Sequence, residues 1–371
     1  MKRRHLITCL LAVGALGGCT TTTRSLTFLA SEQWAQALRS RGVDPQQVAN
    51  PLAFTPEMSA EALRLVGPGD DTDRLRRLQS ALFDVRRFPF AYDVKTTLTA
   101  AEAYHRREGN CLSFTNLFVA MGRSLGIKVQ SGLITRVRGS EREDDLIVVN
   151  THVVAMLTQA GGTIFFDFDR TRRQQPTAVR PLDDLWVTAL YLNNRGADEL
   201  RLRNTEAAAR LFSDAVKLAP QFAAAWGNLG VARRRLGDIP GALAAYAEAL
   251  RGDPSNPTVL SNLALLYGAL GRPSEAEAAL AAARLSAASP HLLIVRGDIE
   301  LARGRVQDAR RLYRRAKRMD PRLADAWVAL ARAELAAGRP SRAHRLAAKA
   351  LQFDPEAAGA AALIDSIEGK R

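Results

Sequence analysis

The second half of the chain carries a 34-residue period, which constrains the fold more than any other feature. Pro220, Pro254, Pro321 and Pro355 lie 34, 67 and 34 residues apart, and the longer interval fits two units. Small residues recur twelve and five positions before each boundary: Ala208, Ala242, Ala276, Ala309 and Ala343, then Ala215, Ala249, Ala283, Ala316 and Ala350. A unit of this length holds two amphipathic helices that bury their apolar faces only against neighbouring units. The period therefore predicts five stacked helix pairs over about 189–355, with a final capping helix over 356–371.

Each unit also begins with a bulky residue, and three units have a glycine four positions later. The bulky residues are Leu192, Trp226, Leu260, Leu293 and Trp327, and the glycines are Gly196, Gly230 and Gly297. This pattern resembles the tetratricopeptide repeat. The resemblance implies an all-α superhelix over 187–371 whose groove holds a protein or peptide partner.

The formal net charge of +14 comes almost entirely from arginine, with 45 Arg and 7 Lys among 371 residues. No basic block alternates with aromatic residues and no cysteines have zinc-finger spacing, so no nucleic-acid partner is expected. One helical segment concentrates the charge: Arg310, Arg311, Arg314, Arg315, Lys317 and Arg318. We expect a solvated helix face there, and contact with anionic lipid headgroups or an acidic partner is the alternative.

The first residues have the form of an export signal. A basic start, Met1–Arg4, precedes a short apolar run, Leu6–Leu16, and then Gly17, Gly18 and Cys19. The run is too short to span a membrane, and its ending resembles the lipobox of bacterial lipoproteins. The resemblance implies a signal peptide over 1–18, lipidation of Cys19, a lipid-anchored tether and linker over 19–60, and an outer-membrane protein facing the periplasm of a bacterial envelope. An ordinary cleaved signal with an incidental cysteine is the alternative.

This interpretation leaves one free thiol. The chain has three cysteines, of which Cys9 would leave with the signal and Cys19 would carry the lipid. Cys111 then has no disulfide partner, although the compartment is oxidising. It is either a buried residue that behaves as a small hydrophobe or a nucleophile.

Helix start and stop signals place Cys111 in a first helical turn. A capping box over 99–102 starts one helix, which ends at Gly109, and Asn110 can cap the next helix over 111–125. The second helix has a buried stripe of Cys111, Phe114, Leu117, Phe118, Met121 and Leu125. The positive end of the helix dipole favours a thiolate at this position.

Two histidines could serve as a base for this thiol. His105 lies beside Arg106 and Arg107, which disfavour an imidazolium. His152 lies in an apolar strand over 146–157. The turn over 161–163 then leads to a strand over 164–169, on which Asp167 and Asp169 share one face. Either aspartate could orient the imidazole of His152.

The stretches "GNC", "LFVAMGRSLGI" and "GGTIFFDFD", with His152 between them, resemble the transglutaminase-like core of the papain-like cysteine fold. The resemblance implies an α+β domain over 61–182, in which a helix packs on an antiparallel sheet. It also implies that Cys111 is the nucleophile, His152 the general base and acid, and Asp167 the orienting group, with Asp169 as the rival. One cysteine and one histidine make a poor zinc set, so no metal or cofactor is expected.

Two functions remain open. The first is an envelope lipoprotein that performs cysteine-dependent amide hydrolysis or acyl transfer, as a protease or a transglutaminase does, on a partner that the repeats recruit. The second is a non-catalytic scaffold for an envelope assembly such as polysaccharide export or secretion.

Overall fold

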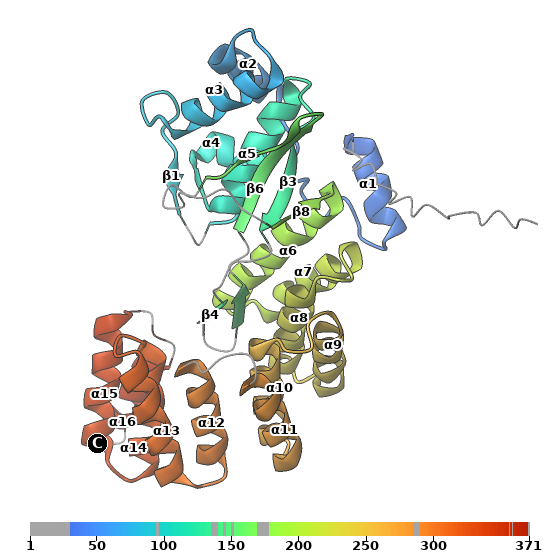
Figure 1. The fold of residues 1–371 in the computed structure, drawn as a ribbon. Helices are drawn as coiled ribbons and strands as arrows, with labels where there is room; N and C mark the ends of the chain where they lie inside the picture. The colour runs from blue at the N-terminus through green and yellow to red at the C-terminus, as the bar shows by residue number, and fades with distance from the viewer. Residues whose placement is uncertain are drawn as a thin grey trace, which may run out of the picture.

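The computed structural model describes residues 30–93, 96–134, 140–143, 146–149, 152–168, 178–284, 290–355, 357 and 359–369. A mixed domain at the N-terminal side is followed by a curved array of helix pairs (Figure 1). The predicted signal peptide over 1–18, the predicted lipidation site Cys19 and the rival aspartate Asp169 lie outside the described residues.

Three helices open the described chain: α1 (Ser31–Ser40), α2 (Pro56–Val66) and α3 (Asp71–Phe83). Thr55 and Asp70 cap α2 and α3 by accepting the N–H groups of Met58 and Asp73. The segment 19–60 was expected to be a tether and linker, but its described part is folded. Trp34, Leu38 and Met58 on α1 and α2 are buried in the core, because both helices present an apolar stripe to it.

A four-stranded antiparallel sheet forms the middle of the domain, with strand order β7-β6-β3-β8. Its strands are β3 (Gln130–Ile134), β6 (His152–Gln159), β7 (Gly162–Phe166) and β8 (Val179–Leu182). The predicted turn at 161–163 is the connection between β6 and β7, whose register pairs Gln159 with Gly162. Because β6 and β7 are antiparallel neighbours, the first residue of β6 and the last residue of β7 lie at the same end of the sheet.

Helix α5 (Cys111–Ser124) packs on this sheet and is covered on its other sides by α2, α3 and the short α4 (Ala100–Arg106). Every residue from Leu112 to Gly122 is buried, so α5 is a central helix rather than the one-sided amphipathic helix that the sequence predicted. The strands β1 (Ala91–Tyr92) and β2 (Glu108–Gly109) pair in parallel just before it.

The strand predicted over 146–157 is divided in two. Its first part, β5 (Leu146–Val149), pairs with β4 (Ser140–Glu143) in a separate hairpin, and β6 begins only at His152. The hairpin leaves the sheet and β5 lies beside α8 of the helical array. A continuous apolar run was therefore misinterpreted, because hydrophobicity alone does not mark where a strand changes partner.

Over the residues that the structure describes, the array consists of five helix pairs and a last helix, as the period predicted. The pairs are α6 (Asp184–Arg201) with α7 (Thr205–Leu218), α8 (Ala223–Arg235) with α9 (Ile239–Gly252), α10 (Pro257–Ala269) with α11 (Pro273–Arg284), α12 (Pro290–Ala302) with α13 (Val306–Met319) and α14 (Ala324–Ala336) with α15 (Pro340–Phe353); α16 (Ala360–Glu368) follows. A Cβ at Gly230 would lie 2.4 Å from the ring of Tyr246, which explains why the repeat has glycine there. No helix among the described residues is both long and apolar enough to cross a membrane.

The domain and the array share one core. Buried residues from Trp34 to Leu266 form a single cluster, whereas the later helix pairs have clusters of their own. Arg123 of α5 makes a two-pronged ion pair with Asp184 of α6, at 3.0 and 2.9 Å, and both side chains are almost completely buried. The Trp34 indole donates to Thr188 on α6 at 3.1 Å. Helix α6 is therefore both the first helix of the repeats and a wall of the domain.

Candidate active site

Cys111 is the first residue of α5, and a buried polar network fixes this helix start. The Asn110 side chain caps the helix by accepting the Ser113 N–H at 3.1 Å, and it donates to Thr97 at 2.7 Å. The Ser113 hydroxyl accepts the N–H of Leu98 at 2.8 Å. These hydrogen bonds join the start of α5 to Thr97 and Leu98, in the segment before α4. The network therefore fixes the position of the first residue of α5, which bears the thiol.

The residue before the cap must be glycine. Gly109 has a φ of 146°, a region that L side chains rarely adopt, and an added Cβ would lie 2.5 Å from the Cβ of Ser113. Parallel pairing of β1 with β2 holds Gly109 from the other side. The chain therefore turns sharply into α5 and leaves the half-buried thiol of Cys111 at the helix start.

His152 is the first residue of β6, an inner strand, and lies at the end of the sheet nearest the start of α5. The Thr115 hydroxyl on α5 donates to the backbone carbonyl of Val153 at 3.2 Å, which joins α5 to β6 next to the histidine. The β6–β7 hairpin then returns the chain so that Asp167 follows directly after β7.

His152 and Asp167 are in direct contact. The imidazole Nε2 lies 2.5 Å from the Asp167 Oδ1, and the two side chains are 11% and 19% exposed. Gln79 on α3 donates its amide to the Asp167 carbonyl at 2.9 Å and so holds the aspartate backbone. Because Nε2 is taken by Asp167, the ring nitrogen left for another partner is Nδ1.

The Cys111 thiol is the other group that interacts with the His152 side chain, and like Asp167 it acts to raise the pKa of the imidazole. Burial alone would lower the pKa of His152, but the hydrogen bonds and charges of Asp167 and Cys111 outweigh it and raise the pKa to about 9. The imidazole is therefore protonated at neutral pH. A cation beside the sulfur stabilises a thiolate, which is the nucleophilic form of cysteine.

The structure thus brings together the three residues that the sequence singled out, Cys111, His152 and Asp167. The other histidine of the domain, His105, is exposed on α4, where it packs against the Tyr104 ring. Across the described residues, no three His, Cys, Asp or Glu side chains form a group that could hold a metal ion.

Sequence reasoning missed the supporting groups. Ser113 and Thr97 complete the cap network, and Gln79 holds Asp167 from a helix 88 positions away in the chain. A signal for the first was present, because a serine three residues after a capping asparagine interrupts an apolar stripe. No local pattern relates Gln79 to Asp167.

The expectation for the arginine-rich segment was wrong for one residue. Arg310 is buried rather than solvated, and its guanidinium contacts the buried carboxylate of Glu334 on α14 at 2.8 and 2.9 Å. The helix face that bears Arg310 packs against the next helix pair, so this cation needs a partner there. Arg311, Arg314, Arg315 and Arg318 are exposed, as expected.

Comparison with protein families matches the two parts of the chain separately. Residues 62–162 match the transglutaminase-like superfamily, and residues 193–257, 233–296 and 300–366 match the tetratricopeptide repeat. The chain carries a transglutaminase-like domain followed by tetratricopeptide repeats. The site described above lies mostly within the first match, with Asp167 five residues beyond its end.

Several solved structures resemble about half of the chain. A thermophilic TPR protein from Thermus thermophilus is 24% identical, with a TM-score of 0.44, over 48% of this chain and 98% of its own. The type IV pilus biogenesis factor PilW is 20% identical, with a TM-score of 0.39, over 49% and 91%. PilF from Pseudomonas aeruginosa is 19% identical, with a TM-score of 0.38, over 49% and 83%. No curated protein matches the chain significantly.

Proposed function

We propose that the chain is a cysteine-dependent acyl-transfer enzyme of the cell envelope, which cleaves an amide bond through a thioester on Cys111. One observation carries the proposal: the imidazole of His152 contacts the Asp167 carboxylate and interacts with the half-buried thiol of Cys111 at a helix start. This arrangement supplies a nucleophile, a proton donor and an orienting group in one place.

The first half of the reaction forms the thioester. The Cys111 thiolate attacks the amide carbonyl carbon, and the N–H groups of the first turn of α5 would stabilise the oxyanion. His152 then gives its proton to the amide nitrogen, the C–N bond breaks, and the amine leaves. Asp167 accepts a hydrogen bond from Nε2 throughout and keeps the imidazole in the orientation that this transfer needs.

The second half releases the acyl group. Neutral His152 takes a proton from water or from an acceptor amine as its oxygen or nitrogen attacks the thioester. The C–S bond then breaks, and the thiolate and imidazolium are restored. Water gives hydrolysis and an amine gives cross-linking; we favour hydrolysis, because bacterial members of the superfamily that the sequence resembles are often hydrolases.

The repeats would bring the substrate or a partner protein to the domain. Tetratricopeptide repeats mediate protein–protein interactions, and here the array shares α6 with the domain, so a bound partner would be held at a fixed place relative to Cys111. The predicted signal over 1–18 and lipid anchor at Cys19 would place the enzyme on the periplasmic side of a bacterial outer membrane.

The test is the reactivity of Cys111 toward iodoacetamide at pH 7, read by mass spectrometry of the peptide that contains it. A thiol with no charged partner is only a few per cent thiolate at this pH. His152→Ala should therefore slow labelling about tenfold or more, whereas His105→Ala, which removes an exposed histidine of the same domain, should leave the rate unchanged.

Equal labelling rates in the two variants, with both folded, would reject the enzyme and favour the non-catalytic scaffold. If His152→Ala does slow labelling, the acyl group should be trapped on Cys111 in an envelope extract and its mass determined. That mass would identify the substrate.

A further inference from the structure

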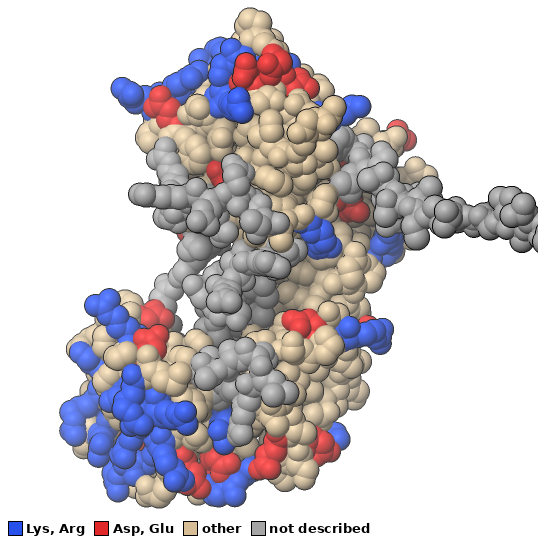
Figure 2. Space-filling model, viewed as in Figure 1, with Lys and Arg blue, Asp and Glu red and all other residues tan. Residues whose placement is uncertain are grey.

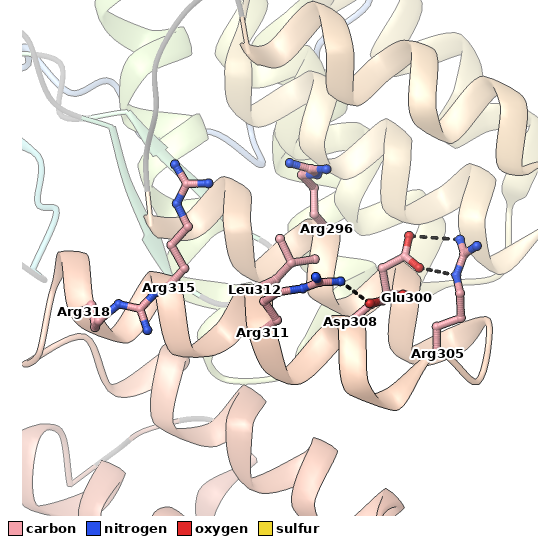
Figure 3. A pocket seen from close by; sticks show the side chains of 8 residues that line it. All are labelled: Arg296, Glu300, Arg305, Asp308, Arg311, Leu312, Arg315 and Arg318. Atoms are coloured by element: carbon pink, nitrogen blue, oxygen red, sulfur yellow. Dashed lines mark hydrogen bonds and ion pairs between the residues drawn. The ribbon is translucent and has the colours of Figure 1, made fainter.

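A hollow of about 600 Å³ lies between α12 and α13 in the fourth repeat, far along the chain from Cys111. Its lining is dominated by five arginines: Arg296, Arg305, Arg311, Arg315 and Arg318. In the view of Figure 3, Arg296 from α12 and Arg315 from α13 project on the same side of the two helices. We call this feature the arginine hollow.

The acidic residues of the arginine hollow neutralise only one end of it. Glu300 pairs with Arg303 at 3.1 Å and also with Arg305. Asp308 pairs with Arg311 within α13. Arg315 and Arg318 are exposed and make no ion pair with any residue that the structure describes. Both acidic residues are therefore already ion-paired, and Arg315 and Arg318 leave positive charge at the other end of the hollow.

The equivalent positions of the first two repeats carry opposite charges. Asp214 and Lys217 in the first repeat form an ion pair at 2.8 Å, and Glu248 and Arg251 in the second repeat form one at 2.6 Å. The period places Arg315 and Arg318 at these same positions in the fourth repeat. Two like charges three residues apart destabilise a helix slightly. The fourth repeat therefore lacks the stabilising ion pair that the first two repeats have at these positions.

Arg296 lies at a position where the first repeat also has an arginine, Arg195, whereas the second and fifth repeats have Leu229 and Leu330, which are 2% and 3% exposed and pack in the core. Arg296 is half-buried and lines the arginine hollow instead. Arginine at this position is thus not peculiar to the fourth repeat; what sets this repeat apart is that Arg296 lines one hollow together with Arg315 and Arg318.

The charge around the hollow follows the same trend. Residues 290–355 contain fifteen Lys and Arg against seven Asp and Glu, whereas residues 184–284 contain eleven against ten. Figure 2 shows Lys and Arg side chains gathering over the last helix pairs. A field of this kind attracts acidic partners and speeds their approach.

We propose that the arginine hollow is a docking site for an acidic, extended segment of a partner protein. Arg311, Arg315 and Arg318 follow one another along one face of α13, about 6 and 4.5 Å apart along the axis. An extended segment presents alternate side chains about 6.6 Å apart, so carboxylates at alternate positions can meet successive arginines. The planar guanidinium accommodates a carboxylate in a two-pronged bond.

A membrane surface fits the arginine hollow less well. A bilayer presents a flat layer of anions, which would meet the rim of a hollow rather than its lining. Glu300 and Asp308 also lie at one end and would face such a layer with like charge. A single chain segment can enter the hollow and avoid them.

The site refines the recruiting role that the proposed function gives to the repeats, and its purpose rests on that proposal. The binding measurement itself needs no catalysis. It uses the full chain carrying Cys111→Ala, so a failure of the chemistry and a failure of the docking site are separate results.

The probe is a fluorescent ten-residue peptide of alternating Glu and Ser, followed by fluorescence anisotropy. We expect binding that weakens as salt is added and no binding of the same peptide with Lys in place of Glu. Arg315→Glu should weaken binding about tenfold or more. The variant should fold normally, because it recreates with Arg318 the ion pair found between Glu248 and Arg251.

Arg210→Glu is the matched control. Arg210 lies in the first repeat at the position that Arg311 has in the fourth, and its replacement by Glu changes the net charge by the same amount as Arg315→Glu. It should bind the acidic peptide as the parent does. Equal loss in Arg210→Glu and Arg315→Glu, no binding of the peptide by the parent, or binding to vesicles of anionic phospholipid in preference to the peptide would each overturn the proposal.

Discussion

Two carboxylates, a half-buried one in the first half of the molecule and a fully buried one in the second, hold a cation in contrasting ways. Asp167 in the transglutaminase-like domain has the imidazole of His152 at 2.5 Å. Glu334 in the last repeat is fully buried and is surrounded by Arg310, Arg339 and Arg342 at 2.8, 3.2 and 3.6 Å. Both arrangements satisfy a charge that would otherwise be costly to bury.

The difference lies in what the cations can do. Burial works to raise the pKa of Glu334, but Arg310 and its neighbours outweigh it, so the carboxyl remains ionised and its arginine partners never lose their protons. The pKa of His152 is raised to about 9, still within reach of a proton transfer, and the Cys111 thiol is one of the groups that raise it. A buried ion pair therefore serves chemistry only when its cation can release a proton to a third group.

The largest expected effect separates the two carboxylates by activity. Asp167→Asn should reduce the rate of acyl transfer about 10⁴-fold, because an amide does not hold the imidazole in the required tautomer and orientation. Turnover of the substrate identified by trapping, or failing that the labelling rate of Cys111, measures it. A variant that keeps its activity would remove Asp167 from the site and direct attention to Asp169.

Glu334→Gln should have the opposite profile. It leaves Arg310, whose side chain is only 7% exposed, without a counter-charge, and we expect a loss of about 3 to 5 kcal/mol in the free energy of unfolding. Denaturant titration followed by circular dichroism measures the loss. The reactivity of Cys111 should not change, since the last repeats have a core of their own.

Arg342→Ala is the control for Glu334→Gln. Its guanidinium is half exposed and lies 3.6 Å from Glu334, which keeps its other arginine partners. We expect less than about 1 kcal/mol. Equal losses in the two variants would mean that Arg310, Arg339 and Arg342 act on Glu334 as one unit, and that Arg310 has no special part in it.

The smallest effect is a gradual one with pH. The pKa of His152 lies near 9 in the folded protein and near 6.5 in the unfolded chain, so its contribution to stability is complete below about pH 6.5 and is lost as the pH rises through about 9. The free energy of unfolding of the parent should fall across this window relative to that of His152→Gln. Glu334 titrates outside it, so Glu334→Gln should leave the slope intact.

The sequence predicted the repeats well because the signal is redundant. Five copies of the period agree on where helices meet, and the ring of Tyr246 against Gly230 is one contact that several units repeat. The residues of the candidate site could be predicted as a short set. The helix-ending Gly109 and the helix-capping Asn110 placed Cys111 at a helix start, and the turn over 161–163 placed Asp167 near the end of the next strand. Alternation puts Asp167 and Asp169 on one face, so the sequence leaves both open, and the structure shows the contact of Asp167 with His152.

What could not be predicted depends on pairs far apart in the chain. Arg123 and Asp184 are 61 residues apart, and Trp34 and Thr188 are 154 apart, yet each pair meets in the shared core. The burial of Arg310 was hidden for a similar reason, because its partner belongs to the next repeat. The division of the apolar run over 146–157 depends on where β5 finds its partner, which composition does not specify.

Helix α6 has a consequence for how the molecule can be divided. Its Asp184 holds α5 of the domain and its Gly196 receives the ring of Phe212 from the repeats, so one helix completes two structures. Separating the chain between the two predicted domains would expose, in each fragment, apolar core residues that the other fragment covers in the full chain. The transglutaminase-like domain is thus inseparable from its first repeat, and any transplant of the active site to another scaffold must carry α6 and α7 with it.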